Sequence, residues 1–143
     1  KSRDNTDNWK VWFKGVTTSD AHSWQLDTNG ANYTGSDKWY NSPNGNDTTT
    51  TTFGVSNDGA TNRSGEDFVA YCFSARKGYS AFGTYKGNGN ANGRYVSTGF
   101  KPRIIIVKKY SSTDDWQIWD TVRDPHNLGH YRLFPSSSAV ETT

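Results

Sequence analysis

Short runs of aromatic and β-branched residues recur along the whole chain, separated by clusters of Asn, Asp, Gly and Ser. This alternation of strand-forming runs and turn-forming clusters is typical of an all-β domain. Only 31% of the 143 residues are hydrophobic, but 15% are aromatic and six are Trp. Each buried ring removes a large apolar area from water, so a few rings can support a fold. We therefore expect one β domain over residues 1–143, with an aromatic core and long polar loops.

Four runs have the clearest strand pattern. Residues 9–13 (WKVWF) and 116–122 (WQIWDTV) each carry two Trp. Residues 67–75 (DFVAYCFSA) and 103–110 (RIIIVKKY) are apolar on both faces, which predicts two central strands covered on both sides. Cys72, the only cysteine, is then expected to be a small buried hydrophobe. Weaker strand patterns are found at residues 23–27, 48–55, 78–86, 93–100 and 130–134. No segment has the pattern of an amphipathic helix, although Asp124-Pro125 permits a short helical turn over 124–130.

The chain opens and closes on similar sequences. Residues 1–12 (KSRDNTDNWKVW) and 108–119 (KKYSSTDDWQIW) share five of twelve residues at an offset of 107, and WQL at 24–26 faces YRL at 131–133. This similarity predicts that residues 1–36 and 108–143 are two copies of one unit, a strand, a turn-rich loop and a second strand. The copies are either tandem repeats with a period of 107 or an internal duplication within one sandwich, and chance similarity is the remaining alternative.

Charge and composition disfavour several classes of partner. The chain has 16 basic and 14 acidic residues and no basic stripe, so we expect no nucleic-acid binding. No apolar run approaches transmembrane length, so we expect no membrane insertion. A single cysteine allows neither an internal disulfide nor a cysteine zinc site. The chain contains no Met and no signal-peptide pattern, which predicts a segment or processed product of a longer protein.

Catalytic and metal motifs are weak. His126 and His130 are spaced four apart, but the residues around them favour a loop, so we expect no metal site. Asp114 and Asp115 are adjacent, which is typical of a solvated turn, and the other copy has Asn8 in place of the second Asp. The glycine-rich stretch 87–93 (GNGNANG) is expected to form a loop tip. We therefore predict no enzyme and no cofactor.

Several aromatic residues lie in polar stretches. Exposed rings beside Asn, Asp and Gly are how lectin-like sites stack on sugars and bond their hydroxyls. The residues that would form such a glycan site are Tyr33, Trp39, Tyr40, Asn88, Asn90 and Asn92. Alternatively, the rings close the ends of the core or pack against a neighbouring subunit. Trp12 and Trp119 lie on strand faces opposite the main core residues, so we expect them at any self-association surface.

The chain also resembles a known family of repeat domains from tail and virion structural proteins of marine bacteriophages. The similar stretches cover most of the chain, with residues 41–62 least similar: 7–15, 68–73, 78–89, 98–102, 104–108, 116–124 and 133–141. The resemblance implies a concanavalin-like jelly-roll, an antiparallel β-sandwich, and no agreed catalytic residues.

Three functions are therefore compared. The favoured function is a non-enzymatic structural protein of a bacteriophage tail fibre or surface appendage, located on the particle surface. Its partners would be other virion subunits or copies of itself. The alternative is a lectin-like module that recognises host surface glycans. A glycan depolymerase would need two converging carboxylates, which would come from Glu66, Asp67, Asp114, Asp115 or Asp120, and acidic residues are scarce in the predicted strands.

Overall fold

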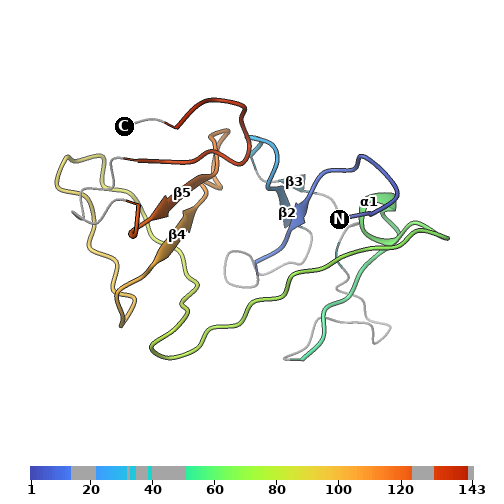
Figure 1. Cartoon of the computed structure of the whole chain (residues 1–143), viewed down its shortest axis with the longest axis horizontal. Helices are drawn as coiled ribbons and strands as arrows, with labels where there is room; N and C mark the ends of the chain where they lie inside the picture. The colour runs from blue at the N-terminus through green and yellow to red at the C-terminus, as the bar shows by residue number, and fades with distance from the viewer. Residues whose placement is uncertain (14–21, 32, 35–38, 40–50, 124–130, 142–143) are drawn as a thin grey trace.

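A computed structural model describes residues 1–13, 22–31, 33–34, 39, 51–123 and 131–141 (Figure 1). These residues form short strands and almost no helix, which confirms the all-β class. The elements in chain order are β1 (Lys10–Val11), β2 (His22–Gln25), β3 (Tyr33–Thr34), α1 (Gly59–Asn62), β4 (Ile104–Val107) and β5 (Gln117–Asp120). No helix among these residues is long and apolar enough to cross a membrane.

The first sheet has the order β1-β2-β3 and is antiparallel throughout. Val11 pairs with Trp24, and the backbone N–H of Leu26 donates to the carbonyl of Trp9 at 3.0 Å, which extends the ladder. Alternation of side chains across the sheet places Trp24 on its covered face, where only 3% of the residue is exposed.

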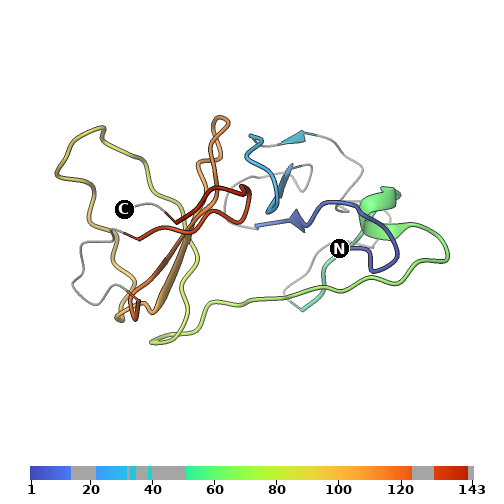
Figure 2. The ribbon, with the colours of Figure 1, turned by 45° about the horizontal axis from the view of Figure 1, so that its top comes forward.

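The second sheet pairs β4 with β5 in antiparallel register, with Ile106 opposite Ile118. The other edge of β5 is bonded to Leu133, since Ile118 and Leu133 exchange both backbone hydrogen bonds, at 3.0 and 3.1 Å. Figures 1 and 2 show the two sheets side by side. They are joined by the indole N–H of Trp116, which donates to the carbonyl of Gln25 at 2.7 Å.

The two similar ends of the chain make the same loop contact. The amine of Lys1 donates to the backbone carbonyl of Asp7, and the amine of Lys108 donates to the carbonyl of Asp114. Each lysine therefore closes a loop that leads into a Trp-bearing strand, at equivalent positions. Burial lowers the pKa of Lys108.

The strand pairs that follow these loops are also related. Val11 is bonded to β2, and its equivalent Ile118 is bonded to Leu133. Leu133 is equivalent to Leu26 rather than to Trp24, so the two pairings differ in register by two residues. A shift of two keeps the same side chains on the same face.

The central part of the chain differs from the prediction. Residues 67–75 are extended but form no strand beyond a bridge between Phe68 and Ser2, and Tyr71 and Phe73 are 69% and 79% exposed. Figures 1 and 2 show this segment running from α1 towards the second sheet without a strand on either side. The expectation of a covered central strand is therefore wrong, because the aromatic residues here contact other rings instead of a ladder. Cys72 is exposed, so the expectation of a buried thiol is wrong as well.

Other predicted strands are reduced or outside the described residues. Residues 104–107 do form a strand, but it lies at the edge of its sheet rather than at the centre. Residues 51–55 contribute a bridge between Val55 and Trp39, and residues 78–86 one between Ser80 and Arg76. Residues 93–100 form no strand. The possible helical turn at 124–130 lies outside the described residues.

The one described helix lies where the sequence indicated a turn. The Asp58 carboxylate accepts from the backbone N–H of Ala60 at 2.8 Å and caps the helix N-terminus. The helix ends at Asn62, because Arg63 returns to an extended conformation. An Asp-Gly pair is typical of turns, but Asp is also a preferred N-cap residue.

Candidate functional site

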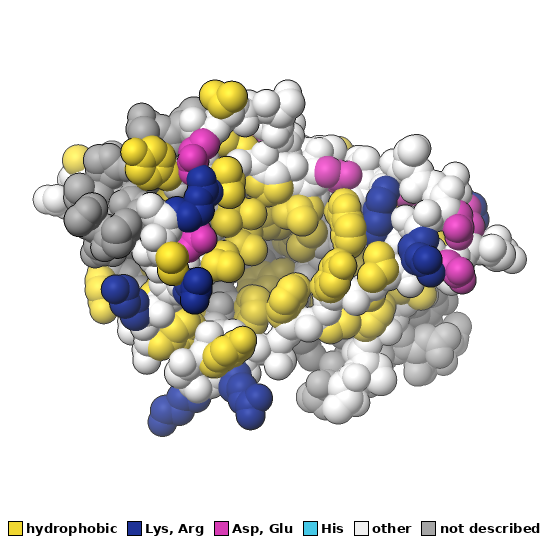
Figure 3. Space-filling model, viewed as in Figure 1, with side chains coloured by type: hydrophobic (Ala, Val, Ile, Leu, Met, Phe, Trp, Pro, Cys, Tyr) yellow, Lys and Arg dark blue, Asp and Glu magenta, His cyan; other side chains and the backbone are white. Residues whose placement is uncertain are grey.

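The most prominent surface feature is a large exposed apolar area. Among the described residues, only Trp24 and Trp116 are buried hydrophobics. Figure 3 shows apolar side chains gathered around a hollow in the middle of one face. The chain exposes 10407 Å², roughly 3,000 Å² more than the 7,400 Å² or so expected of a folded monomer of 16.0 kDa. Among the most exposed apolar residues are Tyr71, Phe73, Tyr79, Tyr95, Ile104 and Ile106.

One aromatic cluster combines two residues that the sequence assigned to different roles. The Trp39 ring lies 6.4 Å from the Trp12 ring and 6.4 Å from the Phe53 ring. Trp12 and Trp39 are half-buried, and the indole N–H of Trp39 is buried without a hydrogen-bond acceptor among the described residues. Trp39 therefore supports the fold through ring packing and cannot offer a fully open face to a sugar.

A second set of rings follows the extended central segment. Tyr71 stacks on Trp9 with ring centroids 5.7 Å apart, and Phe82 lies 6.5 Å from both Phe13 and Phe73. The segment is thus held against the end of β1 by ring contacts rather than by a backbone ladder. The sequence does not distinguish this arrangement from a strand, because strands and ring-stacked segments have the same apolar pattern.

The remaining candidate residues for glycan binding do not form one site. Tyr33 is exposed, and the Lys10 amine lies 5.9 Å from its ring centre. Tyr40 lies outside the described residues. The loop at residues 88–92 lies at one end of the molecule, whereas β3 lies near its middle (Figures 1 and 2).

The asparagines of that loop bond to one another. The backbone N–H of Asn90 donates to the Asn88 side chain at 3.2 Å, and the N–H of Asn92 donates to the Asn90 side chain at 3.1 Å. The Asn88 amide in turn donates to the Asn92 carbonyl at 2.9 Å. These turns are typical of Asn in loop tips and satisfy much of the bonding capacity that a sugar would use.

The two predicted self-association residues lie on different sheets. Trp12 follows β1, whereas Trp119 lies within β5 opposite Ile105 of β4. Both are half-buried. In the described structure the two rings do not form a common exposed patch. If they take part in self-association, each ring does so at its own surface.

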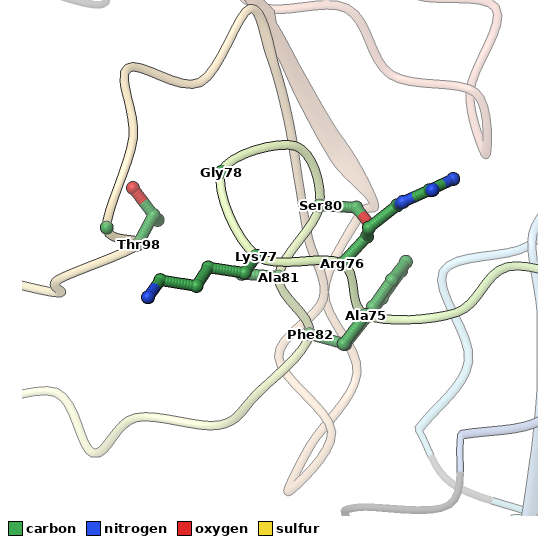
Figure 4. Close-up of a pocket in the computed structure, with 9 residues that line it drawn as sticks. Ala75, Arg76, Lys77, Gly78, Ser80, Ala81, Phe82 and Thr98 are labelled. Atoms are coloured by element: carbon green, nitrogen blue, oxygen red, sulfur yellow. The ribbon is translucent and has the colours of Figure 1, made fainter.

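A pocket of about 360 Å³ lies beside the tight turn at residues 76–80 (Figure 4). Gly78 has a φ of 76°, which glycine adopts without strain. The hydroxyls of Ser80 and Thr98 donate to the carbonyls of Ser74 and Phe100, at 2.7 and 2.6 Å. Figure 4 shows the Lys77 side chain extended toward Thr98. No carboxylate lines this pocket, so its lining offers cationic and hydroxyl groups and no acid or base of the carboxylate type.

The five carboxylates considered for a depolymerase are not gathered in this pocket. Asp115 accepts from the Ser136 hydroxyl at 2.9 Å, and Asp114 accepts from the N–H of Asp115 at 3.0 Å. Asp120 accepts from the N–H of Val122 at 2.8 Å. The Asp114 and Asp120 contacts are local turn and strand-end bonds, whereas the Asp115 contact joins residues 21 apart in the sequence. Among the described residues, no group of three His, Cys, Asp or Glu side chains could hold a metal ion.

The Glu66 carboxylate makes several contacts that hold the fold together, which the sequence did not indicate. Its carboxylate accepts from the Ser2 hydroxyl at 2.8 Å and from the Asn5 amide, and it pairs with Arg63 at 2.9 Å. Desolvation raises the pKa of Glu66, but the hydrogen bonds from Arg63 and Ser2 outweigh it and leave the pKa below its ordinary value. Glu66 thus links the first residues of the chain to the segment after α1.

Comparison with known families gives one match, which covers residues 1–143. No curated protein matches the chain. No solved structure matches it either. The matching family is described as a domain of unknown function, DUF7483, and since the match spans every residue, the chain belongs to this DUF7483 family.

Proposed function

We propose that the chain is a non-enzymatic structural protein of a virus particle, a segment of a bacteriophage tail fibre or surface appendage. In this proposal the two sheets belong to a jelly-roll-like β-sandwich, and long polar loops face outward. The sequence resemblance to marine bacteriophage virion proteins supports the proposal, and the all-β fold is compatible with it. Sheet ladders and stacked rings would provide a stable scaffold while the loops tolerate variation.

The observation that supports this function best is the number of large apolar side chains that the described residues expose. Contiguous apolar patches larger than a few hundred Å² are rare on soluble monomers and mark surfaces that contact a partner. The total accessible surface, polar and apolar together, is roughly 3,000 Å² above that expected of a folded monomer of this mass, which fits a chain that buries surface against partners. A subunit packed among virion proteins would bury such a surface permanently.

For the lectin-like alternative, the surface around Tyr33 is the remaining candidate site for glycan binding. Its ring is 42% exposed and lies beside the Lys10 amine, an arrangement that suits a sugar with an acidic group. Tyr33→Ala tests this directly, since truncation of an exposed ring leaves the fold intact. Loss of binding to acidic host polysaccharides in this variant, but not in Tyr95→Ala, would favour the lectin function.

Localisation in purified particles tests the structural function. Antibodies raised against the chain, used for immunogold electron microscopy of virions that encode it, should label a tail fibre or a surface appendage. Mass spectrometry of the same gradient-purified particles should find the chain at a fixed ratio to the major capsid protein. Absence from washed particles that retain infectivity would refute the proposal.

A further inference from the structure

Among the described residues, β4 is bonded to β5 along one edge and has no backbone partner along its other, open edge. The N–H of Thr121 donates to the Arg103 carbonyl at 2.9 Å, which fixes Arg103, Ile105 and Val107 as the residues that face β5. The two backbone bonds between Ile118 and Leu133 agree with this assignment, because they turn Ile118 away from β4. The backbone groups of Ile104 and Ile106 therefore point away from the sheet.

The side chains on this edge are also exposed. Ile104 is 60% and Ile106 57% exposed, and they share one face of β4 because side chains alternate along a strand. An exposed aliphatic edge strand is a template for pairing with another strand. Within the described structure no sheet or bridge covers this edge of β4.

We propose that the open edge of β4 pairs with β4 of a second copy of this chain, as an antiparallel dimer with its two-fold axis at Ile105. In this register Ile104 of each copy faces Ile106 of the other, and each such pair exchanges two backbone hydrogen bonds. The outward N–H and C=O groups of Ile104 and Ile106 in one copy are thus complementary to the same groups in the other copy. A two-fold interface requires this property, because the same patch must meet itself.

The ends of the strand fit this pairing. Pro102 has no N–H, and its carbonyl already accepts from the Thr121 hydroxyl at 3.0 Å, so the ladder stops there. At the other end, the Lys108 amine is drawn into its loop by the carbonyls of Asn29 and Asp114. Lys109 is paired with Asp114 at 3.9 Å. The nearby cations are therefore held toward their own chain.

The exposed area favours a second copy as the occupant of this edge. The total accessible surface of the single chain exceeds that expected of a monomer, Ile104, Ile105 and Ile106 are all exposed, and a continuous four-stranded sheet of two β4–β5 pairs would cover the isoleucine edge. The inference rests on the proposed structural function for its biological meaning, since it names the partner surface of such a subunit.

Paired charge substitutions test the register. Ile104→Lys with Ile106→Lys places like charges opposite each other in both cross-strand pairs and should give monomers. Ile104→Lys with Ile106→Glu places opposite charges in the same positions and should restore the dimer, with a dissociation constant about tenfold or more below that of the first variant. Sedimentation velocity should give twice the 16.0 kDa mass for the unaltered chain. A monomeric unaltered chain, or equal behaviour of the two variants, would overturn the inference.

Hydrogen exchange tests the same edge without substitutions. The amides of Ile104 and Ile106 should lose protection when the chain is diluted to monomers, whereas the amide of Ile105, which faces β5, should keep it. Protection of all three at every concentration would mean that the chain covers its own edge, and the inference would fail. A monomer that is nevertheless found in virions would leave the structural function intact, so the two failures are distinguishable.

Discussion

Trp116 offers the sharpest test of how the two sheets are held together. Only 8% of the residue is exposed, and its indole N–H donates to the Gln25 carbonyl at 2.7 Å. In Trp116→Phe, loss of this bond should cost about 1 kcal/mol. The smaller ring also removes roughly 40 Å² of buried apolar contact, about 1 kcal/mol more. We therefore expect the free energy of unfolding to fall by about 2 kcal/mol.

The equivalent residue in the other copy provides the control. Trp9 is half-buried and stacks on Tyr71, but its indole N–H makes no hydrogen bond in the described part of the chain. Trp9→Phe keeps most of that stacking and should cost about 0.5–1 kcal/mol. Urea denaturation followed by far-ultraviolet circular dichroism measures both variants on the same scale. A loss below about 0.5 kcal/mol in Trp116→Phe, or equal losses in the two variants, would refute the reasoning.

Three further outcomes are expected. Because the folded pKa of Glu66 is lowered, its contribution is present above the ordinary pKa of Glu and is lost as pH falls through the folded value. Unfolding free energies measured from pH 7 to pH 3 should therefore fall less steeply in Glu66→Gln than in the unaltered chain, and parallel curves would contradict the Glu66 network. Cys72 is exposed, so an aromatic disulfide reagent should titrate one thiol in the native chain without denaturant; a thiol that reacts only after unfolding would contradict its position. Gly78→Ala should cost about 1 kcal/mol because φ is 76°, whereas Gly83→Ala, which has equal space and no positive φ, should be neutral or slightly stabilising; equal urea midpoints would contradict the turn geometry.

The strands beside Trp residues were predictable because their pattern and their partners are both local. β1 and β2 are consecutive strands along the chain, and their alternating residues fix which face is covered. β5 follows the same pattern in the similar segment near the end of the chain. The equal spacing of Lys and Asp at residues 1–7 and 108–114 was visible in the sequence. The loop contact that both lysines make gives this similarity a physical meaning.

The central segment and the candidate sites could not be predicted to the same extent. An apolar run such as 67–75 is compatible with a strand, but its partner is set by contacts far away in sequence, which one sequence does not reveal. The same limit applies to Tyr33 and the asparagine loop, because residue type indicates sugar-binding chemistry and only the fold decides which side chains meet. The N-cap at Asp58 was detectable, since Asp two residues before Ala60 matches a capping pattern.

The bond between Trp116 and Gln25 spans 91 residues, and this distance affects how the chain is made. At a synthesis rate of about 5–20 residues per second, Gln25 leaves the ribosome roughly 5–18 s before Trp116 does. During that interval the first hairpin has no second sheet beside it, and its rings are available to other nascent chains. A host with abundant chaperones would therefore give a higher yield of native protein than overexpression without them.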